Sequence, residues 1–316
     1  MRPLIIGIGE LLWDVLPSGP RMGGAPANFA CHAQAFGASG AVISSVGADE
    51  LGERLLANLS ELGLTTAGIW KDGEAPTGTV DVELGQDGQP HFTIRDHVAW
   101  DRIVVHAPAL QMMSQASAVC FGTLSQRAES SRRSIRELLR AARPGALRVF
   151  DANLRQHFYS RELIHESLEL ANVMKLSDSE LPVIAELLGL HGSVREQLAA
   201  LHERYGLRMI AYTRGAHGSL LWDGSEWSEH PGLPTQVKDT IGAGDSFTAA
   251  ATLGLLQGWP LDEISATANQ VAAHVCSCDG AIPPMPAVLR ERFRWDSRAE
   301  PIPEADPISL EFLKPA

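Results

Sequence analysis

Short, almost entirely apolar runs alternate along the chain with longer segments of mixed polarity. Residues 4–9 and 41–47 are runs of the first kind, which are typical of strands buried on both faces of a parallel sheet. Residues 25–36 and the segment beginning at Asp49 follow them as expected helices, the second with acidic residues in its first turn. Because strand and helix alternate, we predict an α/β fold with a mainly parallel sheet and right-handed crossovers.

The same alternation resumes after residue 101. We expect strands at residues 119–122, 147–151, 173–176, 209–213 and 219–222. We expect helices at residues 130–143, 163–170, 179–188, 193–205, 243–257 and 261–276. The chain contains no internal repeat and no low-complexity tract.

Residues 76–101 break this pattern. Residues 79–84 and 89–95 alternate apolar and polar side chains around a Gly-rich turn, which predicts an antiparallel hairpin that pairs with residues 11–17. Since an isolated hairpin sheet leaves an apolar face exposed, we expect a homodimer through this lid. We divide the chain into an α/β core of residues 1–10, 25–75 and 102–316 and a small β lid of residues 11–24 and 76–101.

Composition narrows the class of protein. Of 316 residues, 45% are hydrophobic and 20% are charged, which excludes a disordered chain. The formal net charge of −12 leaves no basic surplus for nucleic acid or an anionic membrane, and no apolar run reaches the ~18 residues of a membrane helix. The four cysteines follow neither zinc nor disulfide spacing, so we expect reduced thiols in a cytoplasmic protein.

The segment from Val237 to Phe247 carries the clearest chemistry. Gly242-Ala243-Gly244 opens directly into a predicted helix, so backbone N–H groups converge at the positive end of a helix dipole and form an anion hole. Asp245 follows at once. An aspartate at a helix start is often only a cap, but the small residues before it leave space for an anion beside the carboxylate. The combination favours a site in which a phosphoryl group develops charge next to a base.

Two common nucleotide-binding motifs are missing from the sequence. None of the four lysines follows a glycine, which excludes the Gly-Lys-[Ser/Thr] sequence of a P-loop kinase. The run Gly7-Ile8-Gly9-Glu10-Leu11-Leu12 lacks the third glycine of a Rossmann dehydrogenase.

Several motifs in the same order resemble the ribokinase-like (PfkB) carbohydrate kinase family. The C-terminal signature of that family is similar to residues 239–247 (DTIGAGDSF), its N-terminal signature to residues 23–28 (GGAPAN), and its following segment to residues 47–52 (GADELG). Residues 9–14 (GELLWD) and 99–101 (AWD) resemble the fructokinase branch most closely. The resemblance covers the chain from about residue 4 to about residue 286. It implies a three-layer α/β/α sandwich with a small β-sheet lid.

The resemblance also implies an ATP-dependent sugar kinase, most simply for D-fructose, with Mg²⁺ and K⁺ as accompanying ions. Asp245 would be the general base, and the backbone of Gly242, Ala243 and Gly244 would bind the transferring phosphoryl group. The implied sugar-binding residues are Asp14, Gly24, Asn28, Trp100 and Arg155, and the implied nucleotide-binding residues are Lys175, Glu180, Thr213, Gly215, Gly218 and Asn269. Glu180 would hold Mg²⁺ through water, while Asp239, Ile241 and Gly280 would form a monovalent-cation loop.

One position departs from the family pattern, and the substrate stays open. The family's N-x-x-E motif is here Ser177-Asp178-Ser179-Glu180, with serine in place of the amide, and we still expect Mg²⁺ dependence. The alternatives to fructose are 2-keto-3-deoxygluconate, ribose, a nucleoside or a sugar phosphate. A non-catalytic sugar sensor on the same fold is a further alternative. Trp100 could stack on the sugar or belong to the core between lid and body.

Overall fold

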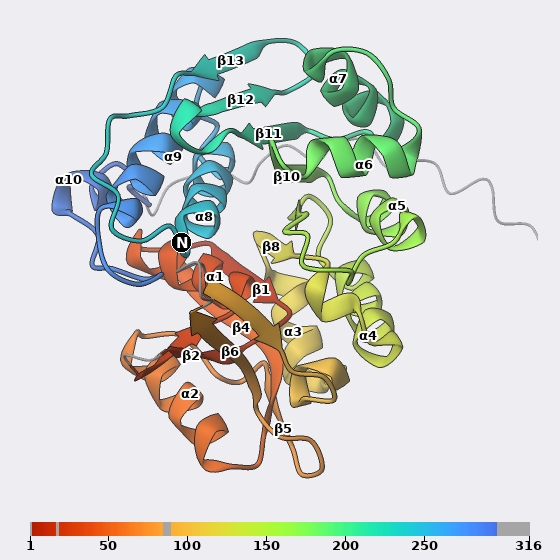
Figure 1. Cartoon of the computed structure of the whole chain (residues 1–316), viewed down its shortest axis with the longest axis vertical. Helices are drawn as coiled ribbons and strands as arrows, with labels where there is room; N and C mark the ends of the chain where they lie inside the picture. Colours follow the sequence, from red (N-terminus) through yellow and green to blue (C-terminus); the bar gives the residue numbers. More distant parts are fainter. Residues whose placement is uncertain (1, 17–18, 85–89, 296–316) are drawn as a thin grey trace, which may run out of the picture.

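The computed structural model describes residues 2–16, 19–84 and 90–295 and contains one large sheet and one small sheet (Figure 1). The large sheet has nine strands in the order β13-β12-β11-β10-β9-β8-β1-β4-β5. Its strands are β1 (Leu4–Ile8), β4 (Ser39–Gly47), β5 (Ile69–Asp72), β8 (Ala118–Phe121), β9 (Leu147–Asp151), β10 (Val173–Ser177), β11 (Met209–Thr213), β12 (Ser219–Trp222) and β13 (Trp227–His230). Neighbouring strands from β11 to β5 pair in parallel, whereas β12 pairs antiparallel with both β11 and β13.

Helices cover both faces of this sheet, which confirms the predicted three layers. One face carries α3 (Ala107–Gln115), α4 (Glu129–Arg140), α5 (Arg161–Leu170), α6 (Leu181–Leu188) and α7 (Val194–Tyr205), whose buried side chains form one core. The other carries α1 (Ala25–Ala35), α8 (Ala243–Leu256), α9 (Leu261–Cys276) and α10 (Ala287–Arg290), with α2 (Glu50–Glu61) beside α1. Figure 1 shows these two groups on opposite sides of the sheet. Among the described helices, none is long and apolar enough to cross a bilayer.

Alternating side chains along each strand supply both cores. On β1, Ile6 and Ile8 pack on the α3–α7 side, whereas Ile5 packs on the α1 and α8 side. Every one of these three side chains is fully buried. When a strand packs against apolar side chains on both faces, no position faces solvent. Such a strand therefore appears in the sequence as a continuous apolar run.

The small sheet has the strand order β3-β2-β6-β7 and lies beside α2 (Figure 1). Its strands are β2 (Leu12–Leu16), β3 (Gly19–Gly23), β6 (Gly78–Leu84) and β7 (Pro90–Ile94). The antiparallel pairing of β6 with β7 and the parallel pairing of β2 with β6 confirm the predicted hairpin and its partner. The predicted Gly-rich turn at residues 85–88, the first residue of the second predicted strand, Gln89, and Pro17 lie outside the described residues.

Part of the apolar face of the small sheet is covered by this chain itself. Leu12, Val80 and Ile94 from the sheet pack with Trp100 and with Leu124, which belongs to the body of the protein. These three side chains of the sheet therefore need no second copy to cover them. Dimerisation itself stays a prediction.

Five of the described helices and strands were not predicted from the sequence. They are the helices α3 and α10 and the strands β3, β5 and β13. The strand β3 is Gly-Pro-Arg-Met-Gly, and β5 is the four-residue segment Ile-Trp-Lys-Asp. All three strands lie at sheet edges, where one side of the backbone has no partner and the sequence needs no continuous apolar run.

Candidate active site

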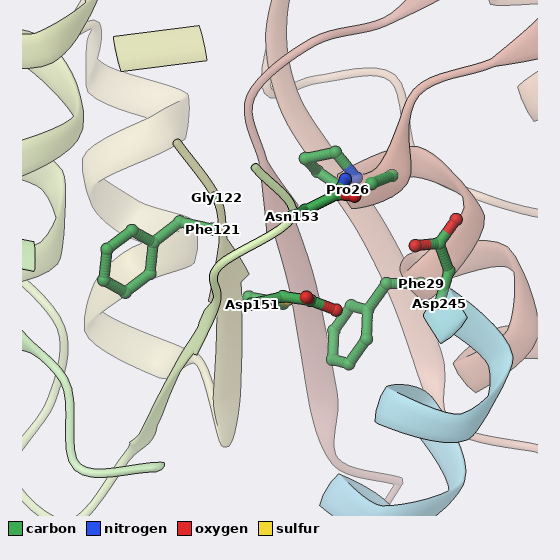
Figure 2. A pocket seen from close by; sticks show the side chains of 9 residues that line it. Pro26, Phe29, Phe121, Gly122, Asp151, Asn153 and Asp245 are labelled. Atoms are coloured by element: carbon green, nitrogen blue, oxygen red, sulfur yellow. The ribbon is translucent and has the colours of Figure 1, made fainter. Parts of the chain in front are cut away.

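The candidate site lies where the carboxyl ends of the central parallel strands meet the first turns of α1 and α8. This is the edge at which open α/β sheets bind ligands. Figure 2 shows a cavity there, with Asp151 at the end of β9 and Asp245 on α8 entering from opposite sides. The cavity is lined by Ala25, Pro26, Phe29, Cys120, Phe121, Gly122, Asp151, Asn153 and Asp245.

The start of α8 has the open backbone that the sequence predicts. Gly242 precedes the helix with a φ of 78°, and no side chain caps the helix start. A Cβ atom at Gly242 would lie 2.5 Å from the carbonyl oxygen of Ala281. Both the left-handed backbone and the close contact therefore require glycine. The Ala243 N–H donates to the Thr240 carbonyl oxygen at 3.3 Å, and no side-chain cap takes up the remaining N–H groups of this turn.

Asp245 lies in this first turn and is held by Asn28 of α1. The Asn28 Nδ2 donates to Asp245 Oδ2 at 2.8 Å. Burial, followed by the nearby charge of Asp151, raises the pKa of Asp245 to about 6, although the hydrogen bond from Asn28 acts in the opposite direction. A carboxyl group with this pKa is ionised at neutral pH and is a stronger base than an exposed aspartate.

A buried ion pair stands next to Asp245. Lys175 of β10 places its Nζ 3.0 Å from Asp151 Oδ1, and the Thr248 hydroxyl donates to Asp151 Oδ2 at 2.9 Å. A Cβ atom at Gly244 would lie 3.2 Å from Lys175 Nζ. The absence of a side chain at Gly244 thus lets the ammonium group reach the backbone at the start of α8.

Most residues predicted to bind the sugar surround the same opening. Gly24 precedes α1 with a φ of 115°, and Asp14 lies on β2 of the small sheet. Burial raises the pKa of Asp14 to about 6, whereas the charge of Arg155 lowers it. The charge of Arg155, in the loop after β9, also lowers the pKa of Asp245.

Trp100 lies elsewhere. Its side chain is 1% exposed and packs in the core between the small sheet and the body. The Arg127 guanidinium group lies over the ring, 4.1 Å from its centre. In this structure the indole offers no open face for a sugar, which favours the alternative that Trp100 is a core residue.

Four of the predicted nucleotide-binding residues lie at or beside the strands β11 and β12. Thr213 ends β11, and Gly215 begins the 3₁₀ turn η3 (Gly215–His217), which Gly218 closes with a φ of 79°. Asn269 of α9 donates from Nδ2 to Ser219 Oγ at 2.7 Å, so it lies beside the start of β12. These four residues form one group along the sheet edge.

The three residues of the predicted cation loop are brought together. Asp239 Oδ1 accepts from the Ile241 N–H at 3.0 Å, and Asp239 Oδ2 accepts from the Gly280 N–H at 3.2 Å. Arg21 Nη1 lies 3.8 Å from the same carboxylate. Within the described residues there is no group of three or more histidine, cysteine and acidic side chains that could hold a metal ion.

Sequence reasoning missed Glu10 as a site residue. It lies two residues after the end of β1, is 3% exposed, and its Oε2 has no hydrogen-bond partner among the described residues. Burial raises its pKa to about 7, and the Asp245 charge contributes to that rise. The sequence does contain a signal for Glu10, because it is an acidic residue just after an otherwise apolar strand. A side chain in that position lies at the carboxyl edge of the sheet, where the other site residues lie.

Comparison with known proteins gives a consistent picture. Residues 19–288 match the model of the pfkB family of carbohydrate kinases. The chain is 30% identical, over 85% of its length and 89% of the relative, to a sugar kinase of Pyrococcus horikoshii. It is 29% identical to a fructokinase of Salmonella typhimurium over 85% of this chain and 90% of that one.

Solved structures show the same fold. The uncharacterized sugar kinase of Pyrococcus horikoshii in complex with ATP superimposes with a TM-score of 0.74 at 29% identity, covering 88% of this chain and 94% of the other. The fructokinase of Xylella fastidiosa with bound ATP gives a TM-score of 0.79 at 23% identity, covering 93% and 98%. The second likeness concerns the fold alone.

Proposed function

Because the chain belongs to the pfkB family of carbohydrate kinases and is a sugar phosphotransferase, we propose that it transfers the γ-phosphate of ATP to a hydroxyl group of D-fructose. The fructokinase names of several relatives support this sugar. The ATP complex of the Pyrococcus horikoshii kinase supports ATP as the donor.

The observation that carries the proposal is the position of Asp245 in the first turn of α8, hydrogen-bonded to Asn28. In the proposed reaction, the Asp245 carboxylate takes the proton of the sugar hydroxyl as its oxygen attacks the γ-phosphorus of ATP. The bond to the bridging oxygen breaks, and ADP leaves. The N–H groups of Gly242, Ala243 and Gly244 stabilise the charge on the transferred group.

The other predicted residues take roles that match their positions. We assign the sugar to Asp14, Gly24, Asn28 and Arg155, and the nucleotide to Thr213, Gly215, Gly218 and Asn269. Asn28 donates to the base and lies one turn into α1, so it orients Asp245 as well as the sugar. Orientation of two reactants can contribute about 7–11 kcal/mol, more than a single donor or the base alone.

The ions are part of the proposal, and we assign a role to one of the two predicted positions. Asp239 draws the backbone of Ile241 and Gly280 together around a carboxylate, so we propose this loop for K⁺. The two oxygens of Glu180 already accept backbone N–H groups, and the residue is 8% exposed. Because this buried carboxylate already holds two backbone N–H groups, we propose no Mg²⁺ role for it, and no step is assigned to a metal there. We still expect Mg²⁺ to accompany ATP.

A panel of sugars tests the substrate. With ATP and Mg²⁺, we expect kcat/KM for D-fructose to exceed that for ribose, 2-keto-3-deoxygluconate, a nucleoside and fructose 6-phosphate by at least tenfold. A coupled assay for ADP measures the rates, and a reaction without sugar gives the background. A higher kcat/KM for another member of the panel would replace fructose. Binding without any ADP release would favour the sensor.

The pH profile tests the base. Since only the ionised Asp245 can accept a proton and its pKa is raised to about 6, kcat/KM should be constant above neutral pH. Below pH ~6 it should fall by a factor of about ten for each pH unit, as expected when a single required base becomes protonated. The pKa of Glu10 is also raised, so Glu10 titrates in nearly the same pH range as Asp245. The acid side of the pH profile can therefore reflect both carboxyl groups.

The Glu10→Gln variant provides the comparison for this profile. Because the pKa of Glu10 is the higher of the two, Glu10 is mostly neutral where Asp245 titrates, and its neutral replacement should leave the Asp245 limb near pH 6. A profile that stays flat down to pH 5 in folded wild-type protein would contradict the assignment of Asp245.

A further inference from the structure

Glu180 joins two loops at the edge of the large sheet. Its Oε1 accepts from the Leu154 N–H at 2.8 Å, and its Oε2 accepts from the Ser177 N–H at 2.7 Å. Leu154 follows β9 and Ser177 ends β10, so the carboxylate connects the ends of two adjacent parallel strands. Although Glu180 immediately precedes α6, its side chain does not cap that helix.

The loop that Glu180 holds after β9 has an uncommon backbone. Asn153 and Gln156 have φ values of 40° and 49°, in the left-handed region that side chains other than glycine rarely adopt. Leu154 lies directly after the first of these residues. Such a turn persists only where its surroundings fix it, and the charge-assisted bond from the Leu154 N–H to Glu180 is one such constraint.

Arg155 is the residue that this turn presents to the site. It is the next residue after Leu154, and its carbonyl oxygen accepts from the Phe158 N–H at 3.0 Å. Its positive charge lowers the pKa of Asp14 and of Asp245, which come from the small sheet and from α8. Its charge thus acts on carboxylates from two separate elements, and a shift of the turn at residues 153–156 would move it.

We propose that Glu180 is a positioning residue for the sugar, which fixes Arg155 through the turn at residues 153–156 instead of holding Mg²⁺. This inference rests on the proposed function and deepens it. Each carboxylate oxygen already accepts one backbone N–H, and the residue is 8% exposed, so a metal-bound water would have to share a buried carboxylate that holds two loops.

The Glu180→Gln variant separates the two roles. Glutamine keeps one acceptor but turns an NH₂ group toward the second N–H, so one of the two loops loses its bond. We expect the KM for D-fructose to rise at least fivefold. We expect kcat and the Mg²⁺ concentration for half-maximal rate to change less than twofold. Ser179→Ala is the matched control. Among the described residues, this exposed hydroxyl forms a hydrogen bond with the hydroxyl of Ser177. Its loss should leave the sugar KM, kcat and the Mg²⁺ requirement unchanged.

Two further measurements exclude a general loss of structure. If Glu180 acts through Arg155, the double variant Glu180→Gln/Arg155→Ala should have the same sugar KM as Arg155→Ala alone. Calorimetry with D-fructose in EDTA, without ATP, should show at least fivefold weaker binding to the Glu180→Gln variant. Should this variant melt below the assay temperature, Glu180→Asp takes its place, because the shorter side chain cannot reach both loops.

Each outcome decides between the roles. A rise in the Mg²⁺ requirement with unchanged sugar binding would overturn the proposal, as would additive effects in the double variant. Failure of the wild-type protein to phosphorylate any sugar of the panel would instead refute the proposed function.

Discussion

Replacing Asp245 with asparagine is expected to lower kcat by about 10²–10⁴-fold, the usual contribution of a general base. Asparagine has the same size and can still accept the hydrogen bond that Asn28 donates at 2.8 Å, but its amide cannot take a proton from the sugar. Calorimetry should therefore show ATP and sugar bound within a few-fold of the wild-type affinities. A coupled ADP assay measures kcat.

The loss should not come from unfolding. Burial disfavours the charged form of Asp245 and raises its pKa to about 6, so the ionised group opposes folding at pH 8. A neutral amide should leave the melting temperature unchanged or raise it. Glu186→Gln removes an exposed carboxylate from α6 and should leave the rate unchanged. An Asp245→Asn variant with more than about a tenth of the wild-type kcat would contradict the general-base role.

The periodicity of the sequence located the interior of the large sheet because β1, β4, β8, β9, β10 and β11 are largely buried on both faces and are therefore mainly apolar. The edge strands β3, β5 and β13 have no such requirement. Their pairing depends on neighbours far away in the sequence. Local sequence patterns therefore predict the central strands and the helix layers of this fold better than the strands at the sheet edges.

The candidate site also contains features that local sequence patterns predict and features that they do not. The anion hole at Gly242–Gly244 and the base Asp245 are contiguous in the chain, so their chemistry is visible in one motif. The environment of Trp100 depends on Leu12, Val80 and Leu124, which come from separate segments, and no local pattern reports its burial. Glu180 is similar, because its two partners belong to the loops after β9 and at the end of β10.

Replacing Lys175 with methionine is expected to lower both stability and rate. Lys175 is buried and lies 3.0 Å from Asp151, whose second oxygen accepts from Thr248. Methionine fills a similar volume but leaves the Asp151 charge without a cation. Breaking a buried ion pair in this way costs about 3–5 kcal/mol, which urea denaturation at pH 8 measures.

The effect on rate has a separate cause. A Cβ atom at Gly244 would lie 3.2 Å from the Lys175 ammonium group, so this charge reaches the proposed anion hole. Loss of one such stabilising group typically costs about 2.7–4 kcal/mol of activation free energy, or about 10²–10³-fold in kcat. The single variant alone cannot separate this loss from a displaced Asp151.

The double variant Lys175→Met/Asp151→Asn makes the separation. Neutral asparagine needs no cation and can still accept from the Thr248 hydroxyl, so most of the lost free energy of unfolding should return. The rate should stay low, because the ammonium group is still missing from the start of α8. If the double variant recovers kcat together with stability, Lys175 acts only by neutralising Asp151, and its role at the phosphoryl group is refuted.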